Sequence, residues 1–263
     1  MLDRLLRIFG WRLLLITGDP CVLDRWLWLR SHLLAGPLRT FDAGSGNGGF
    51  SIYAARIGNE VLGASFSAAE QQSARRRAET LGVSGVDFRV IDLREIEAHR
   101  AALGSFDQIV CLETIEHLGD DQGLVSSLAQ MLEPGGRLLL SAPYLGHRPL
   151  FTEELEPSPV EDGSHVRYGY SPERLAEIVT RAGLQVAQES FISGVLAQKL
   201  TDLMRRLSAR VGVTAAWLAV LPLRPLVVLD PALSRLLRHP YLSVALCAVK
   251  PAGARGDAEA QGA

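Results

Sequence analysis

The stretch Asp42–Gly49, which reads D-A-G-S-G-N-G-G, follows a short apolar run and places glycine at every second position from Gly44 to Gly48. Glycines let a chain turn tightly out of a strand and bring bare backbone against a ligand. The unpaired N–H groups of a following helix then favour a negative group such as a carboxylate or phosphate. Residues 39–67 therefore predict a strand, a ligand-binding turn, a helix and a second strand.

The glycines alone leave the ligand open. Gly44, Gly46 and Gly49 also satisfy the G-x-G-x-x-G pattern of dinucleotide-binding turns. No Lys-Ser/Thr pair follows them, which argues against a phosphate-binding P-loop. A nicotinamide dinucleotide and S-adenosylmethionine remain as candidates, and a tight turn without a ligand is the simplest alternative.

The chain after this turn alternates between strand and helix patterns up to residue 145. Ser67 and Glu70 form a capping-box pattern before one helix, and Ser171-Pro172 is a typical start for another. Strands separated by helices of about 10–15 residues indicate βαβ crossovers and a parallel sheet. The expected strands cover residues 39–43, 60–65, 86–92, 106–113, 134–143, 184–192 and 241–250.

Six segments between residues 37 and 190 resemble, in order and spacing, the class I S-adenosylmethionine-dependent methyltransferases: FDAGSGNGGFS, VLGASFS, VIDLREI, FDQIVCLETIEHL, LEPGGRLLLSAP and HVRYGYSPERLAEIVTRAGL. The resemblance implies an α/β, Rossmann-like, seven-stranded, mostly parallel sheet flanked by helices, with strand order 3-2-1-4-5-7-6. Within this family, the chain is similar to ubiquinone-biosynthesis O-methyltransferases and, more weakly, to cyclopropane fatty acid synthases. The resemblance also selects S-adenosyl-L-methionine as the cofactor.

The resemblance further implies which residues contact the cofactor. The turn would wrap the methionine part, with Asp42 anchoring its amino group or orienting the turn, and Asp92 would bond the adenine amino group. The full predicted set is Asp42, Gly44, Ser45, Gly46, Gly48, Ser65, Phe66, Asp92, Leu93 and Glu113.

Ser65 stands where this family usually ends its second strand in an acid that binds both ribose hydroxyls. A serine hydroxyl can bond one ribose oxygen but without the charge of a carboxylate, at a cost of about tenfold in affinity. Ser65→Asp would then preserve or tighten cofactor binding. Cyclopropane synthases often carry an uncharged residue here, so the change fits an active enzyme as well as a degenerate cofactor sensor.

The sequence C-L-E-T-I-E-H-L places Glu113, Glu116 and His117 where the fourth strand ends. This E-x-x-E-H resembles a metal-binding element of ubiquinone-type enzymes. Three roles compete: a Mg²⁺ ion held by Glu113, Glu116 and His117, His117 as a general base without metal, and structural or cofactor contacts. Glu116 and His165 complete the predicted catalytic set, because His165 lies in a loop resembling the G-T-H element of those enzymes.

The composition limits which partners, location and domain organisation the chain can have. The net charge of −2 gives no reason to expect nucleic acid, and three scattered cysteines suit a reducing cytoplasm. The predicted organisation is a helical flank (1–36), a methyltransferase core (37–195 and 241–251), an apolar basic helical insertion (196–240) and a disordered tail (252–263). A signal peptide is not expected, and the prolines and Arg224 of the insertion are expected to break it into pieces too short to span a membrane.

Residues 196–250 carry eight basic side chains against Asp202 and Asp230 and are rich in leucine and valine. This composition suits peripheral contact with the inner face of a membrane, a lipid-like substrate, or a lid and homodimer face. The sequence thus predicts a cytoplasmic methyltransferase that acts on a small, apolar acceptor, mainly at oxygen. The alternatives are a cyclopropane-synthase-like lipid-modifying enzyme, a non-catalytic S-adenosylmethionine-binding membrane protein and a nicotinamide oxidoreductase.

Overall fold

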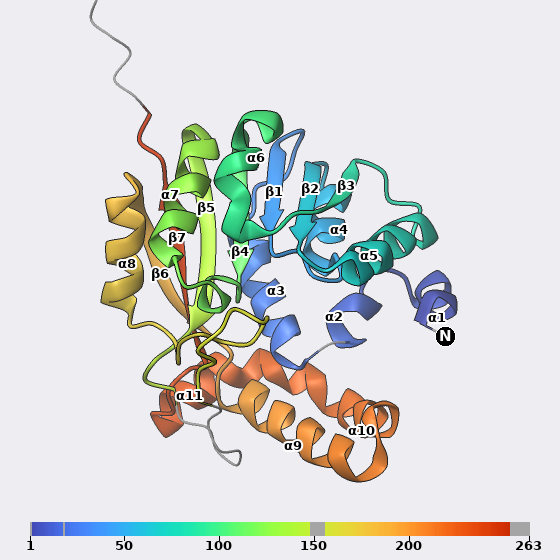
Figure 1. Cartoon of the computed structure of the whole chain (residues 1–263). Helices are drawn as coiled ribbons and strands as arrows, with labels where there is room; N and C mark the ends of the chain where they lie inside the picture. The colour runs from blue at the N-terminus through green and yellow to red at the C-terminus, as the bar shows by residue number, and fades with distance from the viewer. Residues whose placement is uncertain (1, 18, 148–155, 253–263) are drawn as a thin grey trace, which may run out of the picture.

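The computed structural model describes residues 2–17, 19–147 and 156–252. Within them, seven strands form one sheet in the order β3-β2-β1-β4-β5-β7-β6 (Figure 1), which confirms the predicted fold class and strand order. Only β7 runs antiparallel to its neighbours β5 and β6. The strands are β1 Arg39–Ala43, β2 Glu60–Ser65, β3 Val86–Val90, β4 Phe106–Leu112, β5 Leu132–Pro143, β6 Gln185–Ile192 and β7 Ser243–Val249.

Helices cover both faces of the sheet, and the core lies between the layers. Apolar side chains of α6, α7 and α8 pack on one face, and those of α3 and α4 pack on the other, while α1, α2 and α5 close the end of the sheet near β3. The helices of the core and the flank are α1 Leu2–Phe9, α2 Leu13–Thr17, α3 Cys21–His32, α4 Gly49–Arg56, α5 Ala68–Thr80, α6 Ile96–Leu103, α7 Asp121–Met131 and α8 Pro172–Arg181, with short 3₁₀ turns η1 Leu93–Glu95 and η2 Ile115–His117.

The predicted helix starts are present. The Ser67 hydroxyl accepts a hydrogen bond from the Glu70 N–H at the start of α5, and the Ser171 hydroxyl accepts one from the Arg174 N–H at the start of α8. Such caps satisfy backbone N–H groups that the helix itself leaves unpaired. They fix where each helix leaves its strand, and hence where the glycine turn and the loops open.

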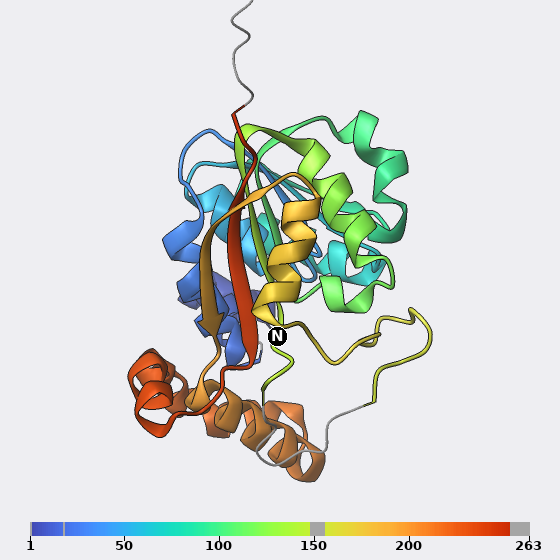
Figure 2. The ribbon, with the colours of Figure 1, turned by 90° about the vertical axis from the view of Figure 1, so that its left-hand side faces the viewer.

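The region between β6 and β7 is mainly helical and forms a layer below the sheet in both views (Figures 1 and 2). It consists of α9 Val195–Val211, α10 Val213–Val220, η3 Leu221–Leu229 and α11 Asp230–Leu237. Because β6 runs parallel to β5, this insertion begins at the edge where the parallel strands have their carboxyl ends. That edge is where ligands bind in open α/β sheets.

One expectation about the insertion was wrong. Pro222, Arg224 and Pro225 do not break it, because the chain continues through them as a 3₁₀ helix that starts at a proline-tolerant first turn. By length and composition, the stretch Val213–Leu237 could cross a membrane, and 28% of its most apolar window is buried in the protein. The domain boundaries themselves remain predictions, and the expected tail lies outside the described residues except for Ala252.

Candidate active site

The glycine turn is held closely against the surrounding elements. Gly44 has a φ of 97°, and a Cβ there would lie 2.2 Å from the Thr114 hydroxyl, on the chain that leaves β4. Gly48 has a φ of 78°, and a Cβ there would lie 2.7 Å from that of Ala74 on α5. Both positions combine a left-handed backbone with contacts that admit no side chain. The turn is therefore packed so closely at the carboxyl edge of the sheet that only glycine fits at these two positions.

Asp42 lies directly before this turn and is 4% exposed. Burial raises the pKa of its carboxyl to about 6, although the Ser51 hydroxyl and N–H both bond to it. The Ser51 hydroxyl donates to Asp42 Oδ2 at 2.5 Å. Asp42 thus joins the end of β1 to the first turn of α4. Its predicted role, to anchor the amino group of the cofactor or to orient the turn, stays a prediction.

A carboxylate does stand at the end of β2, but it comes from another element. The Ser65 hydroxyl donates to Glu70 Oε2 at 2.8 Å, and a Cβ on Gly46 would lie 3.9 Å from Glu70 Oε1. Glu70 therefore lies between the strand end and the glycine turn. Its side chain does not complete the capping box, because the Ser67 N–H bonds to the Ser65 hydroxyl instead, at 3.2 Å.

Sequence reasoning missed Glu70 as a site residue, and it also missed Gln71. Gln71 is fully buried, and its side-chain amide donates to the Ser45 hydroxyl at 3.1 Å and to the Gly46 carbonyl at 3.2 Å. It fixes the turn from α5. The sequence does place Glu70 and Gln71 shortly after a strand that lacks the acid usual at its end. This pair, however, was interpreted only as part of a helix cap.

The other predicted cofactor residues lie along the same edge. The ring of Phe66 is 62% exposed, whereas Leu93 is buried. Asp92 caps η1 and is paired with Arg94, whose hydrogen bonds hold the pKa of the Asp92 carboxyl below its usual value. If Asp92 accepts a hydrogen bond from the adenine amino group, its carboxylate must bind adenine and Arg94 at the same time.

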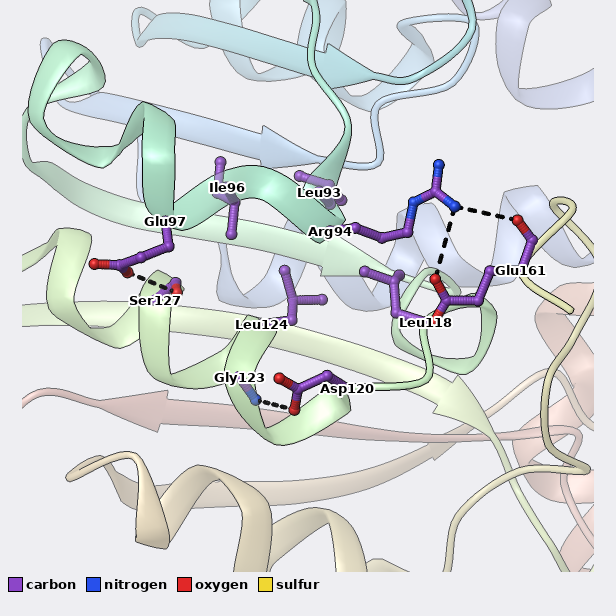
Figure 3. A pocket seen from close by; sticks show the side chains of 10 residues that line it. All are labelled: Leu93, Arg94, Ile96, Glu97, Leu118, Asp120, Gly123, Leu124, Ser127 and Glu161. Atoms are coloured by element: carbon purple, nitrogen blue, oxygen red, sulfur yellow. Dashed lines mark hydrogen bonds and ion pairs between the residues drawn. The ribbon is translucent and has the colours of Figure 1, made fainter.

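A cavity of about 340 Å³ lies beside Leu93 (Figure 3). It is bounded by η1, α6 and the start of α7, and by Glu161 from the loop before α8. Arg94 reaches across it to the Glu161 carboxylate at 3.7 Å. The cavity lining includes none of the glycines between Gly44 and Gly48, so it adjoins the predicted adenine position without containing the turn.

Glu113 is fully occupied by the protein. Its backbone has a φ of 49°, and its carboxylate accepts hydrogen bonds from the hydroxyls of Ser141 at 2.8 Å and Ser243 at 3.0 Å. Arg25 from α3 completes the set with an ion pair of 3.2 Å. Arg25 was not predicted, because nothing in the sequence of the flank indicates that its helix reaches this edge.

Glu116, His117 and His165 converge instead. Glu116 is 1% exposed, and its Oε1 lies 3.9 Å from Nε2 of each histidine. The two imidazole rings meet edge to face with centroids 4.8 Å apart. The structure therefore unites three predicted residues but leaves Glu113 out, so the expectation that Glu113 shares one ion with Glu116 and His117 is not supported by this arrangement.

His165 reaches this place through a pinned loop. The Val166 N–H donates to the Glu116 carbonyl at 2.9 Å, and Arg167 pairs with Asp121 at the start of α7. The hydroxyl of Tyr170 donates to Asp121 at 3.1 Å and is buried, so it serves the loop. These contacts join residues far apart in sequence, which spacing alone could not show.

Burial controls the charge of this group. It raises the pKa of the Glu116 carboxyl well above its ordinary value, and the nearby charge of Glu113 raises it further. Burial and His117 lower the pKa of His165 below its ordinary 6.5. Glu116 Oε2 and His117 Nδ1 are buried without a hydrogen-bond partner among the described residues. Burial thus favours the neutral carboxyl of Glu116 and the uncharged imidazole of His165.

The sequence of this chain is similar to those of known methyltransferases. Residues 41–140 match the family model described as "Methyltransferase domain". The ubiquinone biosynthesis O-methyltransferase of Xanthomonas axonopodis pv. citri is 31% identical over 200 residues, covering 74% of this chain and 81% of the relative. The protein of the same name from Xanthomonas euvesicatoria pv. vesicatoria is 31% identical over 194 residues, covering 72% and 78%.

Solved structures agree on the fold. An S-adenosylmethionine-dependent methyltransferase from Mesorhizobium loti aligns with a TM-score of 0.57 at 19% identity, over 89% of this chain and all of the other. The [4+2]-cyclase SpnF aligns with a TM-score of 0.60 at 20% identity, over 88% and 83%. Because a cyclase shares the fold, the reaction is inferred from the sequence relatives. The glycine turn, the strand order and the relatives together show that the chain belongs to the class I S-adenosylmethionine-dependent methyltransferases.

Proposed function

We propose that the enzyme transfers the methyl group of S-adenosyl-L-methionine to a hydroxyl oxygen of an apolar acceptor, such as an aromatic precursor of a quinone. The observation that carries this proposal is the arrangement of the carboxyl edge of the sheet. The glycine turn and Glu70 lie there, and so does the His117–His165 pair. The names of the curated relatives support oxygen as the accepting atom. We also propose that the reaction takes place in the cytoplasm.

The chain's own residues divide the work of binding. The main chain of Gly44–Gly48 faces the methionine part, with Asp42 as the counter-charge for its ammonium group. Glu70, held by the Ser65 hydroxyl at 2.8 Å, takes the place of the missing strand-end acid and accepts hydrogen bonds from the ribose. Phe66 and Leu93 flank the adenine. A carboxylate from α5 thus replaces one from β2, which accounts for Ser65 without a loss of affinity.

This arrangement reverses the expectation for Ser65→Asp. A new carboxylate at position 65 would face that of Glu70, because the two side chains are now 2.8 Å apart. Like charges at this distance repel, and the Glu70 carboxylate would be displaced from the ribose position. Ser65→Asp is therefore expected to weaken cofactor binding in the presence of Glu70.

The proposed proton acceptor is the His117–His165 pair. Bound S-adenosylmethionine supplies a methyl group already activated by its positive sulfur, so the protein mainly aligns the acceptor and removes its proton. The acceptor oxygen bonds to the methyl carbon as the carbon–sulfur bond breaks, and the hydroxyl proton passes to an imidazole nitrogen. His165 suits this role because its lowered pKa leaves it unprotonated at neutral pH.

The residues do not fit the Mg²⁺ ion considered from the sequence. Mg²⁺ prefers six oxygen ligands, whereas the converging set is two imidazoles and one carboxyl, and Glu113 is bound to Arg25. Glu116, His117 and His165 are a donor set that suits Zn²⁺ better, but an ion there would occupy the imidazole nitrogens that the proposed proton transfer needs. We expect added Mg²⁺ to leave turnover unchanged after dialysis against a chelator. Recovery of lost activity by Mg²⁺ but not by Zn²⁺ would contradict this assignment.

Cofactor affinity should depend on pH through Asp42. Its carboxyl has a pKa of about 6 in the free protein, and an ammonium group binds only the ionised form. Below that pH, binding must first remove a proton, so affinity should fall about tenfold for each further pH unit. Calorimetric titration above and below this pKa measures the effect. Asp42→Asn should bind weakly at every pH, and an unchanged pH dependence in that variant would exclude Asp42 as the source.

The reaction itself can be tested with the full chain, S-adenosylmethionine and a panel of apolar phenols and catechols. We expect S-adenosylhomocysteine to form only when an acceptor is present, and the product to gain one methyl group on oxygen by mass spectrometry. A methyl or methylene group gained on carbon would instead indicate lipid-modifying chemistry. Binding of the cofactor without turnover of any acceptor would favour a non-catalytic role.

A further inference from the structure

The outer surface of the insertion is apolar to an unusual degree. A 3₁₀ helix has three residues per turn, so η3 presents three rows of side chains. The row of Arg224, Val227 and Asp230 is buried. The other two rows face outward and contain no polar side chain: Pro222, Pro225 and Val228, and Leu223, Leu226 and Leu229. These six residues, with Leu218, Leu236 and Leu237, are called the outer face of the insertion.

This face gathers nine exposed apolar side chains in one segment of the chain. Val228 is 62% exposed and Leu236 is 78% exposed, and the chain places such residues along three consecutive elements, α10, η3 and α11. Contiguous exposed apolar patches of this kind mark sites that bind a partner or a membrane. In Figures 1 and 2 the insertion lies at the periphery of the molecule, away from the central sheet.

The exposed charge of the same segment is entirely positive. Between residues 196 and 250 the only acids are Asp202 and Asp230, and both are buried. Exposed arginines border the apolar side chains: Arg210 precedes Val211 and Val213, while Arg235 and Arg238 bracket Leu236 and Leu237. Apolar area with a basic border complements the surface of an anionic bilayer.

A second copy of this chain, or a bilayer that the insertion would span, fits the outer face of the insertion less well. A symmetric pairing of two copies would bring the arginines of one copy against those of the other with no exposed acid from this segment to offset them. A membrane-spanning helix would have to extract Arg224, which is buried and donates to the Ile16 carbonyl. Trp217 donates to the same carbonyl at 2.6 Å, so α10 and η3 are fastened to the N-terminal flank.

We propose that the outer face of the insertion docks this protein on the surface of an anionic phospholipid bilayer, with its helices lying in the membrane plane. The insertion is tied to the candidate active site through α3, which carries Arg25. Thr201 on α9 donates to Asp19, just before α3, at 2.9 Å. Docking would therefore hold the carboxyl edge of the sheet near the bilayer, where an apolar acceptor is concentrated.

Flotation of the full chain with phospholipid vesicles tests the proposal. We expect flotation with vesicles of phosphatidylcholine mixed with phosphatidylglycerol at low salt, much less with phosphatidylcholine alone, and a decline as salt rises. Neutralising Arg210, Arg235 and Arg238 to glutamine should weaken binding about fivefold for each arginine, or about a hundredfold together. Leu223→Ser, Leu226→Ser and Leu229→Ser in one chain should abolish flotation.

Two control substitutions lie near β3, the outer strand on the other side of the sheet from β6. Arg76→Gln on α5 and Val90→Ser on β3 remove an exposed cation and an exposed apolar side chain and should float like the parent chain. Calorimetric binding of S-adenosylmethionine and the thermal midpoint confirm that each variant is folded, and they keep this test separate from the proposed reaction. Absence of flotation with anionic vesicles at low salt would overturn the proposal. So would a stable dimer in sedimentation that the triple leucine variant dissociates, because a second copy would then cover the face.

Discussion

Replacing His117 by alanine is expected to lower kcat by roughly 10²–10⁴-fold, the usual contribution of a positioned general base, while leaving S-adenosylmethionine affinity unchanged. The reason is its place in the cluster: its imidazole meets that of His165 at 4.8 Å between centroids. His165→Ala should produce a loss of the same order. The double variant should lose little more than either single variant, because the pair acts as one unit.

The pH–rate profile of the parent chain adds a second readout. Because the pKa of His165 is lowered from 6.5, the midpoint of the rise in kcat with pH should lie below 6.5. His99→Ala, on the exposed surface of α6, is the matched control and should retain full turnover. If His117→Ala and His165→Ala both kept parental kcat with a confirmed acceptor, the histidines would be structural and the proposed base would have to be abandoned.

Replacing Glu70 by leucine is expected to weaken S-adenosylmethionine binding by about a hundredfold, because charge-assisted hydrogen bonds to the ribose are lost. Glu70→Gln keeps one acceptor and should cost about tenfold. The expectation follows from the contact with Ser65 at 2.8 Å, which aims the carboxylate at the position of the family's strand-end acid. Calorimetric titration with S-adenosylmethionine measures both changes.

A deoxyribose analogue separates ribose binding from a loss of helix stability. The parent chain should bind 2′-deoxy-S-adenosylhomocysteine about tenfold more weakly than S-adenosylhomocysteine, whereas Glu70→Leu should scarcely distinguish the two. Glu79→Leu, near the far end of α5, serves as the control for removing an acid from the same helix. Equal discrimination by the parent chain and by Glu70→Leu would show that Glu70 does not bind the ribose.

The fold could be predicted because its signals are local. Gly44 and Gly48 mark the turn after β1, and Ser67 and Ser171 mark helix starts that the structure confirms. Each of these signals depends on backbone chemistry within a few residues. The order of the strands followed from the family resemblance of six such segments rather than from any single one.

The site could be predicted only in part, because its decisive contacts are distant in sequence. The spacing of Glu113, Glu116 and His117 suggested one cluster, yet Arg25 from the N-terminal flank binds Glu113 and separates it from the others. His165 joins the cluster through a loop whose path no local pattern specifies. Side chains at strand ends choose partners by tertiary packing, so spacing gives the candidates but not their pairing.

Glu70 shows a second reason why the site could be predicted only in part from the sequence. The pattern Ser67–Glu70 was correctly associated with the start of α5, and the Glu70 N–H does bond to the Ser67 hydroxyl. Its side chain, however, accepts a hydrogen bond from the Ser65 hydroxyl at the end of β2. Because helix capping is enough to explain Glu70, its pattern gave no direct sign of a second role. The missing acid at position 65 was the feature that indicated one.

If the turn Gly44–Gly48 and Glu70 form an S-adenosylmethionine site, calorimetric titration of the full chain will detect the binding directly. We expect saturable one-to-one binding of S-adenosylmethionine and S-adenosylhomocysteine, no binding of NAD, and a strong loss of the first two in Gly44→Val, whose side chain would meet Thr114. Binding of NAD, or binding of S-adenosylmethionine that a correctly folded Gly44→Val retains in full, would contradict this expectation.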